Sequence, residues 1–218
     1  MKKVFFLISF VVLTSIVNAQ DQHSQSINPL QKLIDGNERF INGKSIHPDE
    51  SMSRVQEIKS AQHPFAIIVS CSDSRVSPEI VFDQGLGDIF SIRTAGNVIG
   101  DLELGSIEYA VEHLHCNLIV VLGHENCGAI KAFLDDNGEK HNDHIGKILE
   151  YLSEEIEEQE AGVKVNHNVP LAVQANVKHG VTLLEHSKPI LEESVEHKQL
   201  KIVGALYDLS TGKVTFNH

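Results

Sequence analysis

Three residues with metal-binding side chains stand out in the sequence. Cys71 lies in the stretch VSCSDSRV, directly after an apolar run, and His124 and Cys127 lie in LGHENCG, after a second apolar run. Thiolate sulfur and imidazole nitrogen are ligands that zinc prefers. A structural zinc site needs four protein ligands, whereas three ligands with one open position are typical of catalytic zinc. The sequence therefore predicts a catalytic zinc site formed by Cys71, His124 and Cys127.

The remaining cysteine, Cys116, is predicted to lie away from this site. It precedes the apolar run that His124 follows. A strand rises about 3.3 Å per residue, so crossing that run puts Cys116 roughly 20 Å from His124, at the opposite edge of the sheet. We therefore expect Cys116 to be a small, buried hydrophobic residue.

An aspartate and an arginine follow Cys71 on the same loop, at positions 73 and 75. A carboxylate beside the open zinc position can accept a hydrogen bond from zinc-bound water. A guanidinium can hold such a carboxylate ionised through paired hydrogen bonds. We therefore expect Asp73 and Arg75 to form a catalytic dyad, with an ordinary loop salt bridge as the alternative.

Two other interpretations of the cysteines stay open from the residues alone. A disulfide between Cys71 and Cys127 is compatible with an exported protein, but it leaves His124 and the Asp73–Arg75 pair without a role. A nucleophilic cysteine of the phosphatase kind is less well supported, because no glycine-rich phosphate loop follows Cys71.

The elements that must position these residues predict an α/β fold. Short runs rich in Ile and Val alternate with helical stretches, which is typical of a central, mostly parallel sheet flanked by helices. Ligands gather beyond the carboxyl ends of such strands, where Cys71 and His124 lie. We also expect an N-terminal helical arm and a C-terminal hairpin with an antiparallel edge strand. The expected strands cover residues 65–70, 89–93, 117–122 and 200–206, the helices 28–43, 50–61, 102–113 and 126–136, and the hairpin 207–216.

Charge and the first residues bear on partners and location. The net charge of −12 over 218 residues argues against nucleic-acid and anionic-membrane partners, which favour basic surfaces. Residues 1–19 combine a basic head, an apolar run too short for a typical membrane span and a small-residue cleavage site. We therefore expect a signal peptide over 1–19, a single domain over 20–218 and a periplasmic location. Secretion and an uncleaved anchor are the alternatives.

The motifs C-S-D-S-R at 71–75 and G-H-E-N-C-G at 123–128 resemble those of the β-class carbonic anhydrases, as do I-R-T-A-G-N at 92–97 and I-E-Y-A at 107–110. The resemblance implies a lyase that hydrates carbon dioxide reversibly to bicarbonate and a proton by zinc-hydroxide attack. It implies one Zn²⁺ per subunit, with Cys71, His124 and Cys127 as ligands. It also implies a homodimer or higher homo-oligomer with active sites at the subunit interfaces.

Three further positions match the substrate-binding residues of the plant-type branch of that family: Gln62, Phe90 and Tyr109. For the two aromatic residues, a plain core role is the alternative. The other branch has an inhibitory bicarbonate site that contains a tryptophan. Ile68 occupies that position here and the chain has no tryptophan, so we expect the plant-type, non-allosteric branch.

Two rival functions remain open. One is hydrolysis of carbonyl sulfide or carbon disulfide on the same scaffold, since a zinc hydroxide attacks other small heterocumulenes. The other is a binding or assembly protein that keeps zinc only for stability. An intact Asp73–Arg75 dyad argues against the second.

Overall fold

The computed structural model describes residues 28–138, 141–159, 163–164 and 166–217, and the predicted signal peptide lies outside them. Its centre is a five-stranded sheet with the strand order β2-β1-β3-β4-β5. Four strands run parallel, and β5 is antiparallel to β4 at one edge. This confirms the predicted mostly parallel sheet with an antiparallel edge strand. The strands are β1 (Ala66–Cys71), β2 (Ile89–Thr94), β3 (Leu118–His124), β4 (Lys201–Tyr207) and β5 (Val214–Asn217).

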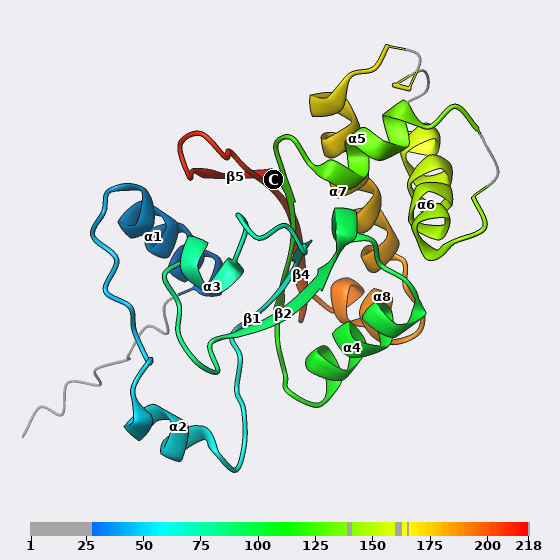
Figure 1. The fold of residues 1–218 in the computed structure, drawn as a ribbon. Helices are drawn as coiled ribbons and strands as arrows, with labels where there is room; N and C mark the ends of the chain where they lie inside the picture. The colour runs from blue at the N-terminus through cyan, green and yellow to red at the C-terminus, as the bar shows by residue number, and fades with distance from the viewer. Residues whose placement is uncertain (1–27, 139–140, 160–162, 165, 218) are drawn as a thin grey trace, which may run out of the picture.

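Helices cover both faces of the sheet, as Figure 1 shows. On one face lie α1 (Pro29–Ile41) and α3 (Pro78–Val81), and α2 (Met52–Ile58) belongs to the long connection from α1 to β1. The other face carries α4 (Asp101–Glu112), α7 (Val169–Glu185) and α8 (Ile190–Glu196). Two further helices, α5 (Gly128–Asp135) and α6 (His144–Gln159), pack against each other and against α7. None of the helices in the described ranges is long and apolar enough to cross a membrane.

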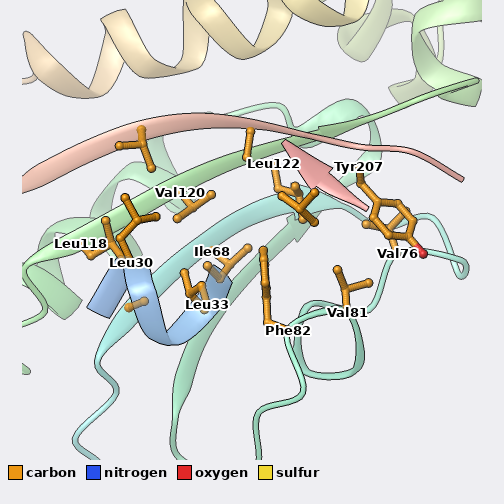
Figure 2. Close-up of a cluster of buried hydrophobic side chains, with 14 residues drawn as sticks. Leu30, Leu33, Ile68, Val76, Val81, Phe82, Leu118, Val120, Leu122 and Tyr207 are labelled. Carbon is orange, nitrogen blue, oxygen red and sulfur yellow. The ribbon is translucent and has the colours of Figure 1, made fainter. Parts of the chain in front are cut away.

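The N-terminal arm forms because its sequence favours a helix at each step. The Asn28 side chain accepts a hydrogen bond from the Leu30 amide at 2.9 Å and caps α1, and Pro29 occupies the first turn, where a missing amide hydrogen costs nothing. The apolar face of α1 buries Leu30 and Leu33 against the sheet. Figure 2 shows these side chains beside Ile68 of β1 and Phe82, which follows α3. Full burial of one such side chain contributes about 1.5–3 kcal/mol.

The two central strands are buried along their whole length, since helices cover both faces. Every residue of β1 and β3 is buried. On the face opposite α1, Val69 and Val121 pack with residues of α4, α7 and α8 in a second core. These layers hold the carboxyl ends of β1 and β3 side by side, with Ser70 paired to Leu122.

Gly123, the residue before the end of β3, lets α7 pack close to that strand. A Cβ atom added at Gly123 would lie 2.5 Å from Cγ2 of Val177 and 3.1 Å from Cγ1 of Val173, both on α7. No side chain larger than hydrogen fits there without displacing Val177. Gly123 therefore sets the distance between α7 and the strand end that carries His124.

Candidate metal centre and active site

Cys71, His124 and Cys127 converge at the carboxyl edge of the sheet. Cys71 is the last residue of β1, His124 is the last residue of β3, and Cys127 is the N-cap residue of α5. Their ligand atoms all lie within 4.8 Å of one another, and all three residues are buried. The two sulfur atoms are 4.0 Å apart. All three cysteines of the chain are free thiols in the structure.

The imidazole of His124 is oriented for metal binding. Its Nδ1 lies 2.8 Å from the carbonyl oxygen of Glu125. A carbonyl oxygen can only accept a hydrogen bond, so Nδ1 carries the proton. The opposite nitrogen, Nε2, is fully buried and has no hydrogen-bond partner among the described residues. Its lone pair therefore points into the site, in the tautomer that a metal-binding histidine adopts.

This arrangement fits zinc. Two thiolate sulfurs bound to one tetrahedral zinc, each at about 2.3 Å, lie roughly 3.8 Å apart, close to the separation in the structure. The orphaned Nε2 of His124 supplies a third ligand at the same place. Cys116 does not belong to the centre. It precedes β3 and donates a hydrogen bond from its sulfur to the carbonyl oxygen of Pro64 at 3.1 Å.

The two sulfurs of the centre shift each other's pKa in opposite directions. The hydrogen bond between the two sulfurs lowers the pKa of Cys71 well below its ordinary value, against the opposing effect of burial. The amide of Gly96, 3.4 Å from the sulfur, lowers it further. The same hydrogen bond between the sulfurs and burial raise the pKa of Cys127. A cysteine whose pKa is lowered gives up its proton to a metal ion more readily, since the thiolate is the form that binds metal.

Asp73 and Arg75 form a two-point ion pair beside this centre. Arg75 donates from Nε to Oδ1 of Asp73 at 2.9 Å and from Nη2 to Oδ2 at 2.7 Å. The same Oδ2 lies 3.9 Å from Nε2 of His124. The hydrogen bonds from Arg75 hold the pKa of Asp73 well below its ordinary value. An ionised carboxylate therefore stands next to the metal-binding atoms, as the sequence predicts.

Arg93 of β2 holds the backbone of the loop over residues 71–76 by hydrogen bonds. The sequence alone did not predict this role. Its guanidinium donates to three carbonyl oxygens: those of Cys71 at 3.2 Å, Asp73 at 2.8 Å and Val76 at 3.0 Å. Arg93 reaches this loop because β1 and β2 pair in a register that sets Arg93 opposite Ser70. The one sequence signal is a charged residue at position 93, near the end of an apolar strand run.

The structure does not bring the three predicted substrate-binding residues to the centre of the same chain. Gln62 is exposed and precedes β1, whereas Cys71 ends that strand. Phe90 lies near the start of β2, paired with Ile67, and is half-buried against the second core. Tyr109 of α4 is 47% exposed and lies against His113, with ring centroids 5.2 Å apart. All three lie toward the β2 edge of the sheet or the amino ends of its strands.

A buried Cys–His–Cys cluster beside an ionised aspartate is the centre of a zinc enzyme rather than a structural zinc knot, which would need a fourth protein ligand. Comparison with known proteins gives the family. The family model described as carbonic anhydrase matches residues 66–214. The carbonic anhydrase of Mycolicibacterium smegmatis is 40% identical over 195 residues, which cover 88% of this chain and 93% of that protein. Carbonic anhydrase 2 of Mycobacterium tuberculosis is 39% identical over 184 residues, covering 83% and 87%.

Solved structures agree with the sequence relatives. The β-carbonic anhydrase CcaA superposes with a TM-score of 0.68 at 28% identity, covering 86% of each chain. The β-carbonic anhydrase of Coccomyxa, solved in complex with acetazolamide, gives a TM-score of 0.68 at 28% identity and covers 85% of each chain. The chain therefore belongs to the β-class carbonic anhydrase family. It is a zinc-dependent lyase that hydrates carbon dioxide reversibly to bicarbonate and a proton.

Proposed function

We propose that Cys71, His124 and Cys127 hold the catalytic zinc and that Asp73 and Arg75 act on the reacting water. The observation that carries this assignment is the fully buried Nε2 of His124, which has no hydrogen-bond partner among the described residues. Two sulfurs lie within 4.8 Å of it, and the Asp73 carboxylate lies 3.9 Å away. Bound zinc supplies a Lewis acid that makes water acidic enough to react near neutral pH.

Asp73, Arg75 and Arg93 each have a separate role in positioning the reacting water. The Asp73 carboxylate accepts a hydrogen bond from the attacking water and so fixes the direction of its lone pair toward carbon dioxide. Arg75 holds Asp73 ionised and in place through two hydrogen bonds. Arg93 keeps the loop that carries both residues attached to β2. Water and carbon dioxide combine to bicarbonate, and the released proton passes to buffer.

Two variants test these roles. Asp73→Ala should lower kcat for carbon dioxide hydration by about 10²-fold or more while zinc content stays at one ion per chain. Cys71→Ser should lose zinc and activity together. Asp35→Ala, which removes an exposed carboxylate from α1, is the matched control and should change neither quantity. Stopped-flow hydration assays and zinc quantitation measure both. Full activity in Asp73→Ala would contradict the proposed dyad.

We further propose that the enzyme is a homodimer or a larger homo-oligomer that pairs copies across β2. This strand is an edge of the sheet, and exposed apolar side chains lie close to it on α4, with Leu102 83% exposed and Tyr109 47% exposed. Two β2 strands related by a two-fold axis run antiparallel. Such pairing brings the amino end of β2 in one copy toward the carboxyl end in the other. Gln62, Phe90 and Tyr109 of one copy would then face the zinc centre of its partner and bind its substrate.

Subunit complementation tests this arrangement. Expressed alone, Gln62→Ala should be weakly active and Cys71→Ser should be inactive. In a mixed dimer, the Gln62→Ala subunit keeps its zinc ligands and receives an intact Gln62 from its partner. Co-expression of the two variants should therefore restore about a quarter of the wild-type activity, since half of random dimers are mixed and each has one complete site. No restoration, or a monomer by analytical ultracentrifugation, would contradict the proposal.

We also propose that residues 1–19 direct export to the periplasm and are then removed, with secretion as the alternative. The support is the basic head at Lys2 and Lys3, the apolar run over 4–17 and the small residue Ala19. Cell fractionation and mass spectrometry of the purified protein test it. A mature chain that begins at Gln20 is the expected result, and an intact Met1 in the cytoplasmic fraction would contradict it.

A further inference from the structure

A backbone amide of the β2–α4 connection points at the sulfur of Cys71. The amide nitrogen of Gly96 lies 3.4 Å from Sγ. Gly96 has φ 69° and ψ 19°, the left-handed conformation that glycine adopts without strain. A Cβ atom there would also lie 3.1 Å from the Cβ of Ala129, in the first turn of α5. The short turn over Ala95–Asn97 is therefore shaped to bring one amide hydrogen to the sulfur of Cys71.

The other backbone group of Gly96 is held from a different part of the fold. Nδ2 of Asn176 donates to the Gly96 carbonyl oxygen at 2.8 Å, from 80 residues further along the chain. Asn176 lies on α7 and is only 3% exposed, between the buried residues Ala175 and Val177. A buried amide side chain on an apolar helix face is costly unless it forms hydrogen bonds. Here its hydrogen bond fixes the glycine that contacts Cys71.

Gly96 thus connects α7 to the metal centre through both of its backbone groups. The link runs from Asn176 Nδ2 to the Gly96 carbonyl, and from the Gly96 amide to the Cys71 sulfur. An amide hydrogen that points at a thiolate partly neutralises its charge and fixes its direction. Groups that orient a metal ligand in this way typically change metal affinity by about 10–100-fold when they are removed.

We propose that Asn176 is a positioning residue for the metal centre, which holds the Gly96 amide against the Cys71 sulfur and so sets zinc affinity. The proposal rests on the proposed role of Cys71 as a zinc ligand. The hydrogen bond of the Asn176 side chain goes to backbone, not to one of the three ligand side chains. It acts through the backbone of one turn, and nothing in its sequence neighbourhood, V-Q-A-N-V-K, marks it as part of a metal site.

The test uses two substitutions at this position in the purified protein. Asn176→Asp keeps the size of the side chain but, when ionised, has no hydrogen to donate to the Gly96 carbonyl. Asn176→Ala removes the amide altogether and serves if the aspartate variant does not fold. Both should weaken zinc binding by about 10–100-fold in competition with a chromogenic chelator. In the cobalt-substituted protein, both should shift the thiolate-to-cobalt charge-transfer absorption.

The matched control is Asn37→Ala. Asn37 is also a buried asparagine that holds backbone, with Nδ2 donating to the carbonyl oxygens of Val81 at 3.1 Å and Gly212 at 2.9 Å, but it lies on α1 away from the centre. It should lower the urea midpoint and leave zinc affinity and the cobalt absorption unchanged. Zinc affinity within twofold of wild type in both Asn176 variants, or an equal loss in Asn37→Ala, would overturn the inference. If Cys71→Ser retained its zinc, the proposed ligand set would fail as well.

Discussion

The carboxylate of Asp73 lies 3.9 Å from Nε2 of His124 and is turned there by Arg75, which binds both of its oxygens. One aspartate oxygen, Oδ2, faces the metal-binding atom and the guanidinium at the same time. The position of the carboxylate, and hence the direction of the hydrogen bond it accepts, depends on a planar two-point contact. A point charge cannot reproduce such a contact.

Arg75→Lys should therefore be a poor substitute despite its conserved charge. A lysine ammonium can neutralise Asp73 but cannot hold both oxygens in one plane, so Asp73 is free to turn. We expect kcat for carbon dioxide hydration to fall by about 10-fold or more with zinc content unchanged. Stopped-flow measurements with zinc quantitation check this. Wild-type kcat in Arg75→Lys would show that charge alone suffices.

Cys116→Ala should leave the metal centre intact. The Cys116 side chain is buried in the second core, and burial raises its pKa to about 11, so it stays an uncharged thiol. Its sulfur donates one hydrogen bond within the described part of the chain, to the Pro64 carbonyl oxygen. Loss of that bond and of one sulfur atom should cost about 1 kcal/mol of unfolding free energy. Zinc content should remain one ion per chain, and a loss of zinc would contradict the assignment of the three ligands.

Gly123→Ala should destabilise the protein and disturb His124. The added methyl group would lie 2.5 Å from Cγ2 of Val177, a stiff β-branched side chain, so Val177 must shift and the packing of α7 on β3 is disturbed. Overpacking of this kind costs about 1–3 kcal/mol. Urea denaturation measures the change, and a midpoint equal to that of the wild type would refute the close contact.

Asp83 should make stability depend on pH in the acid range. Its side chain is 1% exposed and accepts hydrogen bonds from Nε of Arg39 and from the amides of Ile46 and His47. Burial alone would raise the pKa of Asp83, but these donors outweigh it and lower the pKa below the ordinary value. An aspartate with a lowered folded-state pKa stabilises the fold above its unfolded pKa, about 3.9. That contribution is lost as pH falls through the folded-state pKa.

Asp83→Asn isolates this effect. The substitution keeps the side chain's size, and asparagine tolerates the left-handed backbone at this position, φ 47°. It should cost about 2 kcal/mol of unfolding free energy at pH 7, because the ion pair with Arg39 is lost. The difference from wild type should shrink toward zero in strong acid, where Asp83 is also neutral. Urea denaturation at a series of pH values measures it, and a difference that does not change with pH would contradict this role.

The metal centre could be predicted from the sequence because its ligands lie at the ends of strands or just after them. Cys71 and His124 end two apolar runs that could be recognised by composition, and parallel strands bring their carboxyl ends together. The same logic placed the Asp73–Arg75 pair on the loop beside the metal and Cys116 away from it. The C-terminal hairpin could be predicted equally well, because a Ser-Thr-Gly turn separates two strand-like segments.

Contacts that depend on register or on side-chain direction were not accessible in the same way. Arg93 reaches the Cys71–Val76 loop only because β2 pairs with β1 in one register. Asn176 lies in a helix whose pattern is dominated by apolar packing, and its partner is 80 residues away. The positions of Gln62, Phe90 and Tyr109 depend on how copies of the chain associate, which no pattern within one sequence encodes.

The separation of the zinc ligands along the chain also orders events during folding. His124 and Cys127 are near neighbours, but Cys71 lies 56 residues before Cys127. An unfolded chain can therefore offer a metal only the local His–Cys pair, and the third ligand arrives when β1 docks beside β3. Parallel pairing of distant strands is slow, because loop closure precedes the contacts that stabilise it. Tight zinc binding thus follows assembly of the central sheet. Because zinc then binds the folded state much more tightly than the unfolded chain, it stabilises the protein against unfolding.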